Sequence, residues 1–154
     1  MDVTIIQHPA QTLYGLWTAS SDRTVSKDIP ALSKRYYAAI GRDPGTVLPF
    51  MVLSKDYDEK AHTFSLFIGG TVEHNALKSA PLPEGLYGQI TVRPKFSFLW
   101  GPAIGEAKRF FYARWLPGSP YIARNMEYEL HTEQSVGKKP EITLLFSIEK
   151  KAVE

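Results

Sequence analysis

The segment DIPALSKRYYAAIG (residues 28–41) decides the fold, because its pattern recurs later in the chain. Its apolar side chains step by 3, 4 and 4 positions, which is the spacing of one helical face. They are Ile29, Leu32, Tyr36 and Ile40. Asp28 is a good N-cap residue, Pro30 is tolerated in a first turn, and Gly41 is a natural stop. We therefore predict an amphipathic helix over this segment.

A second segment, IGEAKRFFYARWLPG (residues 104–118), carries the same spacing before a Pro-Gly break. Its apolar positions are Ile104, Ala107, Phe111 and Trp115. The two sets are offset by a constant 75 residues, and Met51 and Leu53 map onto Met126 and Tyr128 at the same offset. The alternative is that two amphipathic helices align by chance. We favour duplication of a strand–helix–strand–strand module, because the order of the flanking strands repeats as well.

Alternating or short apolar runs predict strands on both sides of each helix. In residue numbers they are 3–8 with 13–17, 50–53 with 64–68, 86–92 with 96–100, and 126–133 with 142–148. Each pair is close enough in sequence to form antiparallel neighbours, and the first pair, around Pro9-Ala10-Gln11, is either a hairpin or one bulged strand. We expect an α+β fold in which an antiparallel sheet carries both helices on one face, with a cleft along the pseudo-twofold axis and a concave opposite face.

Each half of the chain is too small to bury much surface alone, so the halves share one core in a single domain, residues 1–154. The pseudo-repeats span about 1–75 and 80–150, and residues 73–85 are predicted to be a linker.

Composition narrows the function classes. The chain has 154 residues, a net charge of +2 and no cysteine, which excludes thiolate chemistry and a highly basic nucleic-acid binder. It has no apolar run long enough for a membrane helix and no visible signal peptide. Lys108, Arg109 and Arg114 form only a modest basic patch. We expect a cytoplasmic protein that contacts neither nucleic acid nor membrane and needs no cofactor.

The most informative strand is residues 126–133, because side chains alternate between the two faces of a sheet. Met126, Tyr128 and Leu130 are predicted to face the helices. The opposite face would then carry Glu127, Glu129, His131 and Glu133. This row is either a solvated charged face or an acidic ligand site that favours a cation. Glu127, Glu129 and His131 are close enough for a metal site to be conceivable, but we predict none.

The chain contains 19 aromatic residues, more than one small core readily needs. Several lie on more than one face of their elements, including Phe98, Trp100 and Tyr112, and are candidates for pocket walls. Aromatic faces attract flat cations. None of the common catalytic motifs is found, so the aromatic residues and the acidic row favour binding over catalysis.

The order of several motifs resembles the GyrI-like effector-binding domains, small-molecule-binding modules that occur alone or attached to transcription regulators. The matching segments are IPAL (29–32), FIGG (67–70), WLPGSPY (115–121), YELH (128–131) and the last strand (142–148). The resemblance covers about residues 2–150. It implies paired strand–helix–strand–strand modules with aromatic, hydrophobic and often cationic ligands in the cleft between them.

The resemblance also implies site residues. It places the buried counter-charge on Glu129, with Glu127 as the fallback one strand period earlier. Trp115 and Tyr121 match motif positions, and Phe67 and Phe98 match positions that are usually aromatic. The full set of expected ligand-binding residues is Glu129, Glu127, His131, Trp115, Tyr121, Tyr112, Phe67, Phe98 and Trp100.

Two departures make the pocket more polar than is usual in that family. His131 replaces a tyrosine and Ser33 replaces a tryptophan. Because no DNA-binding segment precedes the domain, we expect a stand-alone multidrug-type binding protein.

Two alternatives remain open. Some GyrI-like proteins hydrolyse cyclopropane-bearing DNA-alkylating natural products. By resemblance, Glu129 would then activate water, while Tyr121, Tyr112 or His131 supplied the acid. The other alternative is contact with DNA gyrase or with a regulator, in which the acidic face would mimic phosphates.

Overall fold

The computed structural model describes residues 1–94, 100–137 and 139–152. Within these ranges the chain forms a single antiparallel sheet and two long helices, as predicted for an α+β fold. The strands are β1 (Thr4–His8), β2 (Gln11–Ser21), β3 (Phe50–Asp58), β4 (Thr63–Gly70), β5 (Lys78–Leu82), β6 (Gly85–Val92), β7 (Tyr121–His131) and β8 (Ile142–Lys150). The helices are α1 (Val25–Ile40) and α2 (Trp100–Phe110), with a π-helical turn at Phe111–Trp115 and a 3₁₀ turn at Glu133–Ser135.

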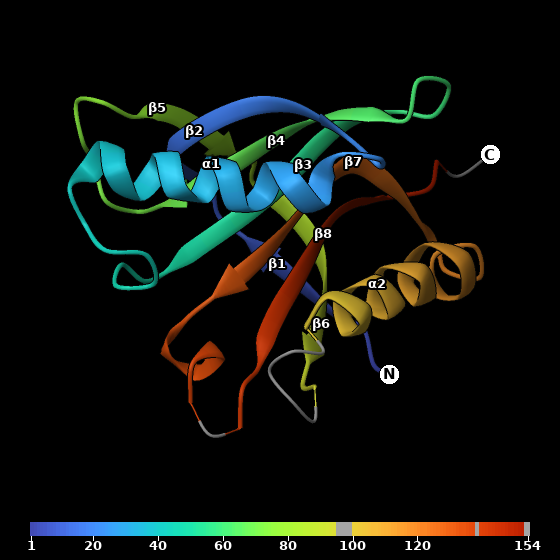
Figure 1. The fold of residues 1–154 in the computed structure, drawn as a ribbon. Helices are drawn as coiled ribbons and strands as arrows, with labels where there is room; N and C mark the ends of the chain where they lie inside the picture. Colours follow the sequence, from blue (N-terminus) through green and yellow to red (C-terminus); the bar gives the residue numbers. More distant parts are fainter. Residues whose placement is uncertain (95–99, 138, 153–154) are drawn as a thin grey trace.

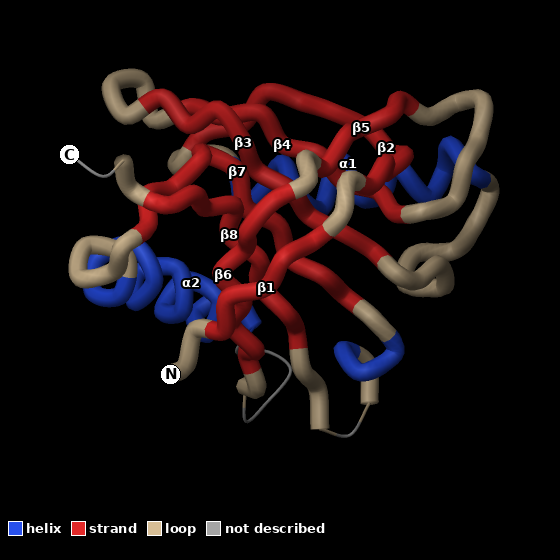
Figure 2. The backbone as a smooth tube through the Cα atoms, turned by 180° about the vertical axis from the view of Figure 1, so that it is seen from behind, coloured by secondary structure: helices blue, strands red, loops and turns tan. Residues whose placement is uncertain are grey.

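The strand order shows the predicted duplication. The sheet runs β1-β6-β8-β7-β3-β4-β2-β5, so the central β3–β7 pair is flanked by β4-β2 on one side and β8-β6 on the other. Each half is a strand, a helix and two further strands. Both helices lie on the same side of the sheet, and the view from behind shows the strands in front of them (Figures 1 and 2).

The helix α1 begins three residues earlier than Asp28, the predicted cap. Thr24 is the N-cap residue, and Asp28 lies in the first turn. Its carboxylate accepts hydrogen bonds from the hydroxyls of Thr24 (2.7 Å) and Ser20 (2.8 Å), and these bonds lower the pKa of Asp28. The helix ends as predicted at Gly41, whose φ of 66° is the left-handed conformation that glycine adopts without a Cβ clash.

Both faces of the sheet are buried. Under α1, apolar side chains from the helix meet β3 and β4, and the main ones are Leu32, Tyr36, Val52, Leu66 and Ile68. Under α2 the corresponding group is Ala107, Phe111, Leu144, Phe146 and Ile148. The opposite face holds a third core that joins both ends of the strand order, with Leu13, Ala80, Tyr87, Tyr128 and Leu145. The sheet therefore curls around this third core, and the concave face is filled rather than open.

Two of the four predicted strand pairs are confirmed: β3 with β4 and β7 with β8. Of the two alternatives for residues 3–8 and 13–17, the hairpin was wrong, because β1 and β2 do not pair with each other. After the bend at Pro9-Ala10 the chain passes from one half to the other, so β1 pairs with β6 while β2 pairs with β4 and β5. This exchange also explains why residues 73–85, predicted to be a linker, contain strand β5.

The prediction of a strand over residues 96–100 falls mostly outside the described residues. Trp100, its last residue, opens helix α2. No helix in the described residues is long and apolar enough to cross a membrane.

Candidate functional site

A cleft of about 1030 Å³ opens between the two helices, above the central strands of the sheet. One wall comes from the first half of the chain. Its apolar part is formed by Val25 and Ile29 of α1, Val52 of β3 and Phe64 of β4, and the charged side chains of Asp22, Lys55 and Glu59 also line it. The other wall comes from the second half, with Lys108, Arg109 and Tyr112 beside Glu127 and Glu129 of β7. The position agrees with the expected cleft between the modules, and the size suits a drug-like ligand.

The acidic row of β7 faces the helices, which corrects the predicted orientation of this strand. Val52 is opposite Glu129 in β3, and Leu144 is opposite it in β8; both belong to the cores beneath the helices. Met126 and Tyr128 instead enter the concave core on the other face. The strand alternates as predicted, but because both faces of the sheet are buried, the pattern alone did not show which face carried the helices.

The two glutamates of the cleft share one ammonium group. The Lys108 Nζ atom lies 3.4 Å from Glu127 Oε2 and 3.9 Å from Glu129 Oε1. Burial of Lys108 would lower its pKa, but the carboxylates of Glu127 and Glu129 outweigh this effect and raise it. Lys108 therefore carries its positive charge through the neutral range.

Glu129 is the most enclosed acid of the site, with 9% of its surface exposed. A carboxylate so placed between apolar strands needs partners, since burying an unpaired charge is costly. Its Oε2 atom lies 3.2 Å from His131 Nε2, on the side away from Lys108. The ring of His131 also packs edge-on against Phe50. Glu129 therefore has a partner at each carboxylate oxygen, Lys108 at Oε1 and His131 at Oε2.

The π-helical turn after α2 shapes the second wall. The Leu116 amide donates to the Phe111 carbonyl at 2.8 Å, a five-residue span that widens the last turn. Such turns recur at functional sites. Here Tyr112 and Leu116 line the cleft, while Phe111 stacks inward on Phe146. Burial and the Glu127 carboxylate hold the pKa of the Tyr112 hydroxyl far above its usual range.

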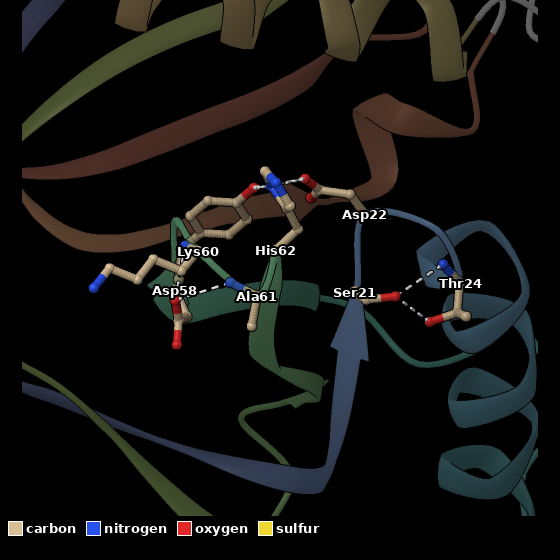
Figure 3. Close-up of polar contacts among 8 residues, drawn as sticks. Ser21, Asp22, Thr24, Asp58, Lys60, Ala61 and His62 are labelled. Carbon is tan, nitrogen blue, oxygen red and sulfur yellow. Dashed lines mark hydrogen bonds and ion pairs between the residues drawn. The ribbon is translucent and has the colours of Figure 1, made fainter.

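A polar cluster from the first half of the chain contributes Asp22 and Tyr57 to the cleft lining. The Tyr57 hydroxyl donates to Asp22 Oδ2 at 2.6 Å and lies 3.0 Å from His62 Nδ1. Figure 3 shows Asp22 and His62 facing each other at the end of β2 and the turn between β3 and β4. The hydrogen bond to Asp22 raises the pKa of Tyr57. This cluster joins the end of β2 to β3 and to the turn that follows it.

The structure brings together three of the predicted ligand residues, Glu127, Glu129 and Tyr112, with His131 next to Glu129. In the described part of the cleft the lining does not include Trp115, Tyr121 or Phe67. Trp115 stacks between Phe111 and Tyr121 in the core beneath α2. Phe67 is fully buried in the concave core.

For two other predicted ligand residues, Phe98 and Trp100, the position of the side chain relative to the cleft is not described. Phe98 lies outside the described residues, and of Trp100 only its place at the start of α2 is described.

Sequence reasoning missed Lys108 as part of the site and counted it with a surface patch. Its signal was its spacing from Tyr112, four residues on, which places both on one helical face. The apolar part of the first wall was also missed. Val25 lies before the predicted start of α1, and Phe64 was predicted to lie in a strand without a role in ligand binding.

No family model and no curated protein sequence matches this chain. Solved structures match its fold. A candidate bacterial transcription regulation protein from Staphylococcus aureus MU50 is 13% identical, with a TM-score of 0.72, over 97% of this chain and 99% of that one. SAV2435 bound to tetraphenylphosphonium is 14% identical, with a TM-score of 0.70, over 97% and 94%.

A hydrolase from Listeria innocua is 10% identical, with a TM-score of 0.54, over 96% of this chain and 91% of that one. At these identities the matches show the fold alone. They are consistent with the resemblance of the sequence to GyrI-like domains.

Proposed function

We propose that the cleft binds hydrophobic, aromatic small molecules that carry a positive charge. The observation that carries the proposal is the partly enclosed cleft with two glutamates on its floor, one of them 9% exposed. A deep carboxylate next to apolar walls attracts a cation that brings its own apolar surface.

The balance of charge supports this ligand class. The lining contains four acids, Asp22, Glu59, Glu127 and Glu129, against three bases, Lys55, Lys108 and Arg109, so the cleft keeps one net negative charge. The rings of Tyr57, Phe64 and Tyr112 supply faces for an aromatic ligand. Each cation–π contact contributes about 0.5–2 kcal/mol. SAV2435, which shares the fold, is bound to a cation of this kind.

Isothermal titration calorimetry with tetraphenylphosphonium tests the proposal. We expect saturable binding, weakened about tenfold or more by Glu129→Gln, which keeps the shape of the side chain and removes its charge. Glu106→Gln is the matched control. Glu106 lies in the second half of the chain, on α2, but it is exposed and does not line the cleft. Equal affinities for the wild type and both variants would refute a role for the Glu129 charge.

A hydrolase of cyclopropane-bearing DNA-alkylating compounds is the second candidate. The pair of Glu129 and His131, 3.2 Å apart, favours it, because an acid and an imidazole in contact suit activation of water. Tyr112 is better placed than Tyr121 to reach a bound molecule, since it lines the cleft. Turnover of such a compound that disappears in Glu129→Gln, with the thermal midpoint unchanged, would decide for catalysis.

A further inference from the structure

Lys108 holds the position that the charged group of a ligand needs. Its ammonium group lies between the two glutamates, 3.4 Å and 3.9 Å from their oxygens. Glu127 and Glu129 are two residues apart on one strand, so both carboxylates project from the same face of the sheet. A cation that enters the cleft to meet either of them meets Lys108 first.

The same side chain is able to leave. About 31% of the Lys108 side chain is exposed, against 12% for Glu129 and 20% for Glu127. A lysine ammonium sits on a flexible four-carbon stem and is strongly hydrated, so it regains water when it turns outward. The glutamates have shorter side chains and lie on the central strand β7, so Lys108 is the member of the group that moves.

We propose that Lys108 is a specificity-determining residue: it acts as a tethered counter-ion that a cationic ligand displaces from Glu127 and Glu129. This inference rests on the proposed function and adds a rule for its ligands. Small hydrated ammonium ions offer no more than Lys108 already supplies. A large cation with delocalised charge displaces Lys108, because burial of its rings adds to the attraction.

The proposal predicts opposite effects of Lys108 on ligands of opposite charge. Tetraphenylphosphonium and tetraphenylborate have almost the same shape and differ in sign. In Lys108→Gln, tetraphenylphosphonium no longer competes with a tethered cation and should bind about tenfold more tightly, a gain of about 1.4 kcal/mol. Tetraphenylborate should bind more weakly than to the wild type, because the two glutamates are left without their ammonium partner.

Two matched variants separate this effect from general electrostatics. Arg114→Gln removes the same charge from the same half of the chain, but Arg114 is exposed and does not line the cleft. We expect a change of less than about threefold. Lys34→Gln, on an exposed position of α1, should change nothing. Lys108→Arg keeps the charge and should weaken tetraphenylphosphonium binding, since a guanidinium grips carboxylates through two parallel hydrogen bonds.

Calorimetry on the full chain, with the thermal midpoint of each variant as a folding check, gives distinct outcomes. Tighter binding in Lys108→Gln and weaker binding in Lys108→Arg support the inference. If the wild type binds and neither variant differs from it, or Lys108→Gln binds less tightly, the inference is overturned while the proposed function stands. Binding by Lys108→Gln alone supports the inference and refutes cation binding by the wild type. No binding by any of them overturns both, and if Lys108→Gln fails to fold, Lys108→Arg decides alone.

Discussion

The second wall of the cleft, which carries Lys108 and Tyr112, depends for its stability on one buried aromatic ring. Phe111 is 0% exposed, and its ring stacks on Phe146 at 3.9 Å and on Trp115 at 5.2 Å. It also fills the space where a side chain at Gly88 would project, since a Cβ there would lie 2.9 Å from the ring. Replacing Phe111 by alanine removes the contact through which the π-helical turn packs on β6 and β8.

The cost follows from the burial and the stacking. Truncating a buried phenylalanine to alanine costs about 3–5 kcal/mol, including the cavity that remains. With two stacked partners lost, we expect a value near the middle of this range, about 4 kcal/mol. For a chain of this size each kcal/mol lowers the thermal midpoint by about 2–4 °C, so the midpoint should fall by about 8–16 °C. The neighbouring Tyr112 is 38% exposed, and its change to alanine should cost about 1–2 kcal/mol.

Urea unfolding followed by far-ultraviolet circular dichroism measures both variants against the wild type. Phe111→Leu is the third member of the series and should recover at least half of the loss, because it refills most of the cavity. The reasoning is refuted if Phe111→Ala and Tyr112→Ala lose the same free energy of unfolding, since the ring would then not be the anchor of the turn.

Three further predictions concern the sheet, α1 and the pH dependence of stability. Gly69→Ala should unfold the protein or strongly destabilise it in urea, because its Cβ would lie 2.2 Å from the Tyr14 carbonyl oxygen; Gly101→Ala, with open space around it, is the control. Burial raises the pKa of Tyr128 to about 12, so the neutral Tyr128 ring stabilises the fold fully below pH 10, and this stabilisation is lost as the pH rises to about 12. Alkaline unfolding followed by circular dichroism and tyrosinate absorbance should be less steep in Tyr128→Phe. The lowered pKa of Asp28 works in the opposite direction, stabilising the fold above pH 4 and less as the pH falls, so Thr24→Ala should move the acid unfolding midpoint to higher pH.

The sequence predicts the local elements well and the long-range ones poorly. Helix α1 follows from its 3–4–4 spacing and from Gly41, because both are set by residues close in the chain. The partner of β1 could not be predicted from local sequence, because β6 lies about 80 residues away and pairs with β1 only through the curl of the whole sheet. The period-two pattern of β7 also predicts that Glu127 and Tyr128 project from opposite faces of the sheet, but it does not indicate which of the two faces carries the helices.

The candidate site shows the same division. Glu127, Glu129 and Tyr112 were found from pattern and resemblance, because their elements are regular. The partnership of Lys108 with the two glutamates was not found, since it joins α2 to β7 through space and has no trace in local spacing. Trp115 fits the resemblance yet stacks in the core beneath α2, because the widened turn directs it away from the cleft lining.

The two halves of the chain have the same topology, but the charged residues of the site come from equivalent positions in the second half only. At the 75-residue offset Leu53 maps onto Tyr128, and these two residues are also paired across the central strands, so the pseudo-twofold axis passes between them. The same offset relates the uncharged side chains of the first half to the site residues of the second. The pairs are Val52 with Glu127, Ser54 with Glu129, Ser33 with Lys108 and Tyr37 with Tyr112.

This asymmetry gives the cleft a direction. A symmetric copy of the acids would place four carboxylates on the floor around one axis, where each added charge is costly without a partner. Instead, the linked charges of Lys108, Glu127 and Glu129 lie on the α2 side of the cleft, and the apolar side chains of Ile29 and Phe64 lie on the α1 side. A cationic aromatic molecule bound by the proposed mode therefore has one orientation that satisfies both walls: its charge toward β7 and its rings toward α1. Substitution of Ile29 should then affect affinity for the rings, and substitution of Glu129 the affinity for the charge.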